Sequence, residues 1–239
     1  MVRAAALLGL LAILGFYFGV AEDLPGLSEW GDVAFLALGL IPVTFLLVWL
    51  ALPLRTAGSV ALGAAAVSLA AVTAILEATH LDVAANFVKL AAAAAVGWWF
   101  LGFFEALSWV LLVALLIIPV DAFSVARGPT KEIVENQPEV FNALSVSFTL
   151  PGQHSSAQLG LPDILFFSLF LGAAARFGLR AGWTWIAMAF SFGTTLALAV
   201  GFDVAGLPAL PLLSAAFVLV NADLLWRAYR GRSSAMRSN

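Results

Sequence analysis

Gly160-Leu161-Pro162-Asp163 opens an apolar segment that continues through Ile164-Leu165-Phe166-Phe167 to Phe177 and is long enough to cross a bilayer. An aspartate therefore stands at the head of a membrane segment. Ionisable groups inside the hydrocarbon layer are expensive, so each one is a candidate for function. A second such residue, Asp121, lies near the end of the preceding apolar segment. The chemistry of this chain depends on whether the two carboxyls meet.

The composition defines the class of protein. The chain has 239 residues, of which 63% are hydrophobic and 10% are charged. Soluble domains average about 45–50% apolar and about 25% charged residues. The chain is therefore predicted to be an all-α polytopic membrane protein. It contains no cysteine, which excludes disulfides and thiolate chemistry. Its basic residues form no run before a short arginine-rich tail, so no nucleic-acid partner is expected.

About eight apolar stretches reach the length of a bilayer-spanning helix, which is about 17–25 residues. The predicted segments are residues 4–20, 33–52, 57–76, 83–104, 106–125, 159–177, 181–201 and 207–226. The first one has a signal peptide as its alternative, because Arg3 precedes it and Gly19-Val20-Ala21 resembles a cleavage site. Its apolar run is longer than the usual core of a signal peptide, which favours a retained helix.

The arginines predict the orientation. Counted over alternate joints, they fall on one side of the membrane, and the positive-inside rule makes that side cytoplasmic. These residues are Arg3, Arg55, Arg176, Arg180 and the tail residues Arg227, Arg230, Arg232 and Arg237. Both termini are then inside, and the acidic joints are outside. A prokaryotic plasma membrane is the expected location.

The sequence divides into three predicted parts: N-terminal helices (1–105), a core with both aspartates (106–226) and a basic tail (227–239).

One connection, residues 126–158, is long. Within it Val146-Ser147-Phe148-Thr149-Leu150 alternates apolar and polar residues and ends at Pro151-Gly152, which predicts a short β-strand. A strand at the mouth of a helical bundle can accept an extended peptide along its edge. The alternative interpretation is a loop with a few packed apolar residues.

The two aspartates are predicted to lie at one depth. Asp121 is about 15 residues, or roughly 22 Å, into its segment, which leaves it roughly 8 Å from the outer surface of a core about 30 Å thick. Asp163 is roughly 6 Å from the same surface, because its segment runs the other way. Such carboxyls can share a proton and titrate as a unit. Taken singly, Asp163 also fits a first-turn carboxylate at a helix N-terminus, and Asp121 a helix-end residue.

The last apolar segment opens with Gly206-Leu207-Pro208-Ala209-Leu210-Pro211. Its two prolines lack backbone N–H groups and disrupt a helix. Irregular backbone at membrane depth is tolerated where protein or a water-filled cavity satisfies it. The alternative is a helix that simply begins at its prolines.

These features together resemble the presenilin and signal peptide peptidase family of intramembrane aspartyl proteases. Asp121 ends one helix, Gly160-x-x-Asp163 begins the next, and Pro208-Ala209-Leu210 follows two helices later. Gly128-Pro129 with Ile133-Val134-Glu135 is similar to the presenilin sequence after its first catalytic aspartate. Leu159–Asp163 with Arg176-Phe177 is similar to signal peptide peptidase. The resemblance covers about residues 106–226.

The resemblance implies a presenilin-like bundle and hydrolysis of peptide bonds within transmembrane segments. It implies that Asp121 and Asp163 activate a water molecule without a cofactor or metal. The implied substrate contacts are Gly160, Leu161, Pro162, Val146, Phe148, Leu150, Pro208, Ala209 and Leu210. The expected partners are the lipid bilayer and a transmembrane-helix or signal-peptide substrate of signal-peptide-like or type II topology. Obligate partner subunits are not expected, although the sequence leaves that question open.

The chain departs from the family pattern in three places. Val120 stands where the family usually has tyrosine, and Pro162 stands where it has glycine. About eight helices are predicted instead of nine. These departures keep a catalytically inert member open as an alternative. A proton-coupled transporter that uses the same aspartates is the alternative from another class.

Overall fold

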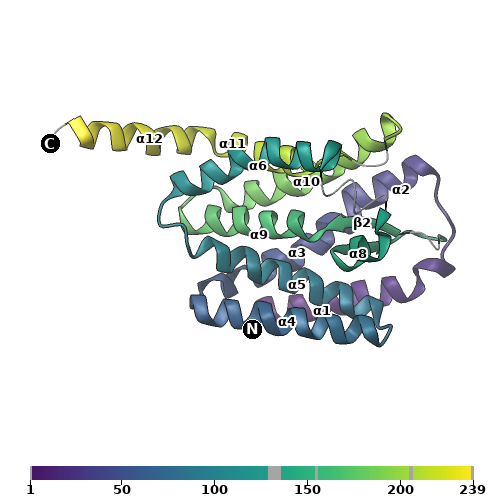
Figure 1. Ribbon diagram of the computed structural model, residues 1–239. Coiled ribbons are helices and arrows are strands. Elements are labelled where there is room, and N and C mark those ends of the chain that lie inside the picture. Colours follow the sequence, from purple (N-terminus) through teal and green to yellow (C-terminus); the bar gives the residue numbers. More distant parts are fainter. Residues whose placement is uncertain (1, 129–135, 154–155, 205–206, 238–239) are drawn as a thin grey trace.

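The computed structural model describes residues 2–128, 136–153, 156–204 and 207–237, and it is an all-α bundle with one small hairpin (Figure 1). The α-helices of its first half are α1 (Val2–Val20), α2 (Glu29–Phe35), α3 (Ile41–Ala51), α4 (Ser59–Ala78), α5 (Asp82–Leu101) and α6 (Leu107–Arg127). Those of its second half are α8 (Pro138–Ala143), α9 (Leu161–Arg176), α10 (Ala181–Gly201), α11 (Leu210–Val220) and α12 (Ala222–Arg237). Short helices η1 (Ala21–Asp23), η2 (Leu36–Leu40) and η3 (Leu52–Thr56) join the early elements.

Helix α9 is the centre of the bundle. Every residue from Phe167 to Ala174 is buried, so this helix is covered on all sides. Helices α5, α10, α11 and α6 all contact it. The approach of α5 is close, because a Cβ atom at Gly97 would collide with the Leu165 carbonyl oxygen. Phe170 of α9 stacks on Phe217 of α11 with ring centroids 4.8 Å apart. Asp163 is thus attached to the best-packed helix of the protein.

The described residues hold fewer candidate membrane-spanning helices than predicted. Six described helices are long and apolar enough to cross a bilayer, or seven if α11 and α12 count as one bent span. The predicted segment 159–177 forms a helix of 16 residues, because Gly160 still belongs to a strand and Pro162 lies in the first turn of α9. The predicted eighth segment bends by 67° between α11 and α12.

A buried asparagine explains the bend. The Asn221 side chain donates to Thr184 Oγ1 (2.9 Å) and to the Phe217 carbonyl oxygen (2.9 Å). Its Oδ1 atom accepts the backbone N–H of Arg180 (3.0 Å). The end of α11 is therefore tied to the start of α10, and α12 leaves in a new direction.

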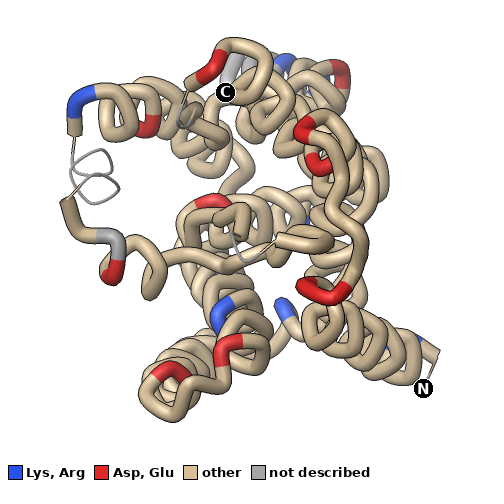
Figure 2. Tube along the Cα trace, turned by 90° about the vertical axis from the view of Figure 1, so that its right-hand side faces the viewer, with Lys and Arg blue, Asp and Glu red and all other residues tan. Residues whose placement is uncertain are grey.

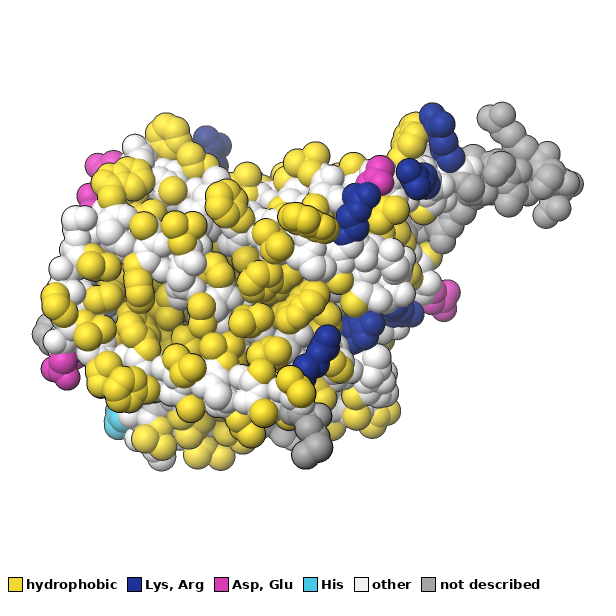
Figure 3. All heavy atoms as spheres, turned by 180° about the vertical axis from the view of Figure 1, so that it is seen from behind, with side chains coloured by type: hydrophobic (Ala, Val, Ile, Leu, Met, Phe, Trp, Pro, Cys, Tyr) yellow, Lys and Arg dark blue, Asp and Glu magenta, His cyan; other side chains and the backbone are white. Residues whose placement is uncertain are grey.

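The surface supports a multi-pass integral membrane protein. Hydrophobic side chains cover the middle of the face in Figure 3, and charged side chains lie mainly towards its two ends. Figure 2 looks onto the hairpin end of the bundle and shows acidic residues around its rim. An apolar belt between charged ends is what a bilayer requires.

Candidate functional site

Asp121 lies in the last turns of α6 and reaches the opening of α11. Its Oδ2 atom accepts a hydrogen bond from the backbone N–H of Leu210 at 3.1 Å. Helix α6 packs chiefly against α11, so this contact belongs to an extended helix pair. Pro119 lies inside α6 and lacks an N–H, which deprives the Leu115 carbonyl of its usual intrahelical donor. The helix nevertheless continues without a break from Leu107 to Arg127.

Leu210 can bind Asp121 because the chain before it is not helical. Leu207 and Pro208 precede α11 without regular structure, and Pro211 lies in its first turn. The first N–H groups of a helix have no partner within the helix, so they bind an acceptor from elsewhere. Asp121 supplies that acceptor across 89 residues of sequence. The segment thus begins as a helix at its second proline, which agrees with the alternative interpretation, and Gly206 lies outside the described residues.

Asp163 lies in the first turn of α9, directly after the hairpin. The Gly160 backbone N–H donates to its carboxyl, and the negative charge of Asp121 acts on the same group. A Cβ atom at residue 160 would lie 3.2 Å from Asp163 Oδ2. Glycine at this position therefore gives the carboxyl room. Leu161 is half-buried, and Pro162 is exposed.

Three distant parts of the sequence thus converge at one end of the bundle. Asp121 and Asp163 are both half-buried residues. The Pro208-Ala209-Leu210 segment is joined to Asp121, and the charge of Asp121 reaches Asp163. Two carboxyls whose charges interact titrate as a coupled pair.

The strand in the long loop is confirmed, one residue earlier than predicted. Strand β1 is Ser145–Thr149, and it pairs with an antiparallel strand β2, Ser156–Gly160, which the sequence analysis missed. Val146 opposes Leu159 and Phe148 opposes Ala157. The Val146 and Phe148 side chains are 3% and 2% exposed, so the core holds them. Alternation of polar and apolar residues over Ser156–Gly160 was the available signal.

The outer edge of β1 is bonded to side chains of the helices. Asn86 of α5 both donates to the Ser147 carbonyl oxygen (3.3 Å) and accepts its N–H (3.1 Å). The Tyr17 hydroxyl of α1 donates to the Thr149 carbonyl oxygen (2.8 Å). Neighbouring residues of a strand point their backbone groups to opposite edges, so these contacts all lie on the edge away from β2. An added strand would find that edge occupied.

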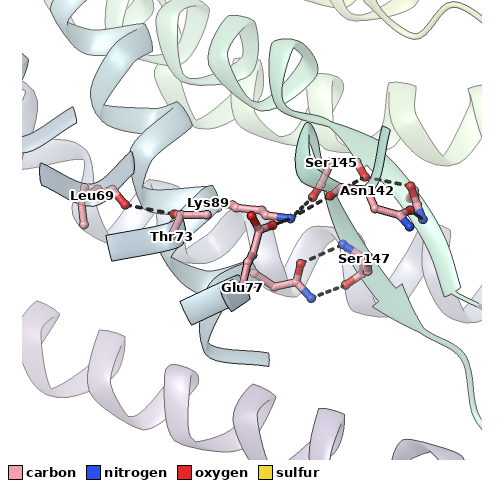
Figure 4. A network of polar contacts seen from close by, with 9 residues as sticks. Leu69, Thr73, Glu77, Lys89, Asn142, Ser145 and Ser147 are labelled. Carbon is pink, nitrogen blue, oxygen red and sulfur yellow. Dashed lines mark hydrogen bonds and ion pairs between the residues drawn. The ribbon is translucent and has the colours of Figure 1, made fainter. Parts of the chain in front are cut away.

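Lys89 of α5 also holds this edge of β1, a role that the sequence analysis did not predict (Figure 4). Its ammonium group donates to the carbonyl oxygens of Asn142 (2.8 Å) and Ser145 (3.2 Å) and pairs with Glu77 Oε1 at 2.6 Å. The Lys89 side chain is only 7% exposed. A lysine within an otherwise apolar helix was the signal that could have found it.

Leu150 lies beside a second acidic group rather than beside the two aspartates. It lines a cavity of about 430 Å³ together with Ala157, Leu36 and the buried residue Asp32. Gln153 donates to Asp32 Oδ2 at 2.6 Å. In the described part of the chain, no group of three or more histidine, aspartate or glutamate side chains is placed to hold a metal ion.

The stretch after Asp121 that carries part of the family resemblance, Pro129 with Ile133-Val134-Glu135, lies outside the described residues. The chain matches no known protein-family profile, and no curated protein is similar to it in sequence. The functional assignment therefore depends on the residues themselves.

Proposed function

We propose that this protein is an intramembrane aspartyl endopeptidase that cleaves transmembrane segments with an Asp121/Asp163 dyad. The observation that carries the proposal is the hydrogen bond from the Leu210 N–H to Asp121, at the end of the bundle where Asp163 opens α9. An isolated helix cap would account for Asp121 alone. It would not account for a second half-buried carboxyl at the same end of the bundle, in the first turn of α9.

The proposed chemistry balances with water as the only co-reactant. The ionised carboxylate of the pair removes a proton from a water molecule, whose oxygen attacks the scissile carbonyl carbon. The protonated partner donates its proton to the carbonyl oxygen, which gives a neutral gem-diol. A proton then moves to the peptide nitrogen, the C–N bond breaks, and a carboxylic acid and an amine are released. The dyad is treated as a unit because its two protonation states are coupled.

The hairpin supports an entry route along β2. Because the outer edge of β1 is bonded to Asn86, Lys89 and Tyr17, the proposed pairing edge moves from Val146–Leu150 to β2. The outward backbone groups of β2 belong to Ser156, Gln158 and Gly160, since these oppose the residues whose partners are side chains. The Gly160 N–H on this edge donates to Asp163, so a strand added here would run beside the carboxyl.

The orientation is part of the proposal. The arginine-bearing end of the bundle faces the cytoplasm by the positive-inside rule, and the end with the dyad faces outward. This arrangement suits substrates whose N-termini are cytoplasmic, and it fits a prokaryotic plasma membrane.

The decisive experiment replaces each carboxyl separately and measures cleavage of a transmembrane model substrate in proteoliposomes. Asp121→Asn and Asp163→Asn are expected to lower kcat by about 10²–10⁴-fold, the usual contribution of acid–base groups. Asp203→Asn is the matched control, because Asp203 has a left-handed backbone (φ 52°) that asparagine also tolerates. Full activity in either dyad variant refutes the proposal. Proton-coupled uptake without cleavage would support a transporter instead.

Disulfide cross-linking tests the entry route. Because the chain contains no cysteine, only the introduced thiol can react. A substrate cysteine should form a disulfide with Gln158→Cys more readily than with Ser147→Cys. The two positions oppose each other across the hairpin, but only the edge of β2 is predicted to contact substrate. Equal or reversed yields would return the pairing role to β1.

A further inference from the structure

A cavity of about 490 Å³ lies at the end of the bundle opposite the two aspartates. It is formed where η3, the start of α4, the end of α5 and the end of α9 come together. Its polar lining includes Arg55, Thr56, Ser59, Trp98 and Arg176, and Trp99 adds an apolar wall. None of the described residues that line it is acidic. The cavity therefore gathers positive charge without a compensating carboxylate.

Two donors at this cavity are buried without a partner. The Nε atom of Arg55 and the Nε1 atom of Trp98 have no hydrogen-bond partner among the described residues and no contact with solvent. The Trp98 side chain as a whole is 4% exposed. A buried donor without an acceptor costs stability, so such groups call for an acceptor from outside the chain. Arg176 uses one N–H on the Leu101 carbonyl oxygen (2.9 Å) and has further donors on its guanidinium group.

The start of α4 adds to the positive electrostatic potential at the cavity. Its N-cap residue is Gly58, which provides no side-chain hydrogen bond to the first turn. The N-terminus of a helix of this length carries a partial positive charge, and its first N–H groups point outward. Ala57 and Ser59, on either side of the cap, both line the cavity. Helix N-termini with neighbouring arginines are sites where phosphate groups bind.

We propose that this cavity binds a phosphate-bearing anion, namely the headgroup of an anionic phospholipid. Arginines that serve only to set orientation need no cavity and keep their nitrogens in water. Here one arginine nitrogen and one tryptophan nitrogen, both from residues that line the cavity, are withheld from solvent. Leu62 and Leu101 extend the lining with apolar surface on which the first carbons of an acyl chain can lie. Basic pockets between membrane helices at the cytoplasmic side are suited to such lipids.

The test measures lipid binding to the purified full-length protein by native mass spectrometry. Phosphatidylglycerol is compared with phosphatidylcholine, and inorganic phosphate is added in a separate arm. The Arg55→Gln/Arg176→Gln variant should bind phosphatidylglycerol about tenfold or more weakly than the wild type, as expected for lost charge-assisted hydrogen bonds. The matched control Arg3→Gln/Arg227→Gln removes two exposed arginines at the same end and should bind as the wild type does.

A second variant keeps the proposal testable if the double arginine variant fails to fold. Trp98→Phe removes one buried donor and no charge. It should therefore weaken the binding of phosphatidylglycerol several-fold and leave the binding of phosphatidylcholine unchanged. Displacement of phosphatidylglycerol by inorganic phosphate would support the proposal, because it shows that the cavity binds the phosphate group. Binding of inorganic phosphate without binding of phosphatidylglycerol would overturn the lipid assignment in favour of a soluble anion. Equal binding of both lipids, or an equal loss in the Arg3/Arg227 control, would overturn the proposal.

Discussion

The strongest structural prediction concerns Lys89, whose ammonium group joins three parts of the chain. Its three hydrogens can serve Glu77 and the carbonyl oxygens of Asn142 and Ser145, and all three acceptors are within 3.2 Å. Lys89→Met keeps the length of the side chain but removes every one of these contacts. It also leaves Glu77, whose side chain is 34% exposed, without its cation.

The size of the effect follows from burial. Removing one partner of a buried ion pair costs about 3–5 kcal/mol, because the other charge stays uncompensated. Glu77 remains partly hydrated, so the cost should fall near the lower limit, about 3 kcal/mol. For a chain of this size each kcal/mol lowers Tm by about 2–4 °C, which gives a fall of about 6–12 °C. Thermal unfolding in detergent, followed by the fluorescence of the eight tryptophans, measures it.

A double variant separates the ion pair from simple loss of packing. Lys89→Met/Glu77→Met replaces both charges by apolar side chains, which is often close to neutral. The free energy of unfolding should therefore recover to within about 1 kcal/mol of the wild type. Asp82→Asn removes an exposed charge at the start of α5 and should change stability by about 0.5 kcal/mol or less. The reasoning is refuted if Lys89→Met unfolds at the wild-type temperature, or if the double variant is less stable than the single one.

Two further predictions concern packing and orientation. Gly97→Ala should destabilise the protein by about 1–3 kcal/mol, since its Cβ atom would collide with the Leu165 carbonyl oxygen; Gly15→Ala, with nothing within 4 Å of its Cβ atom, should leave Tm unchanged or slightly raised. An impermeant maleimide applied to intact cells should label Asp82→Cys but not Glu105→Cys, because these exposed residues flank opposite ends of α5. The reverse labelling would invert the proposed orientation.

Apolar runs predicted most of the helices, because a bilayer requires long uninterrupted apolar segments and few other sequence patterns look like them. They failed where backbone geometry, and not hydropathy, decides the structure. Leu159 and Gly160 were assigned to a helix, yet they end strand β2, since the pairing with β1 reaches as far as Ser145. Asn221 was counted within a continuous segment, yet its three hydrogen bonds end α11.

The candidate site was foreseen in part, for a similar reason. Antiparallel order alone placed Asp121 and Asp163 near one surface, and the prolines marked the opening of α11. The contact between Asp121 and the Leu210 N–H could not be predicted, because it depends on how α6 packs against α11. Lys89 was overlooked because a single charge barely changes the average over twenty apolar residues, whereas its effect on stability depends on its three partners.

The hairpin gives the N-terminal helices a role that the sequence did not suggest. Tyr17 of α1 and both Asn86 and Lys89 of α5 hold β1 by its outer edge, so part of the region before residue 106 fixes the strand pair that leads into Asp163. The hydrogen bonds from the helices are therefore concentrated on the outer edge of β1. The outer edge of β2 presents its backbone groups beside the Asp163 carboxyl. In the proposed function, a hairpin held in this way need not be ordered by the substrate, which lowers the entropic cost of adding a strand. Under the proposed function, loosening the Lys89 network should raise KM for a transmembrane substrate before it changes kcat, and a fall in kcat at unchanged KM would contradict this role.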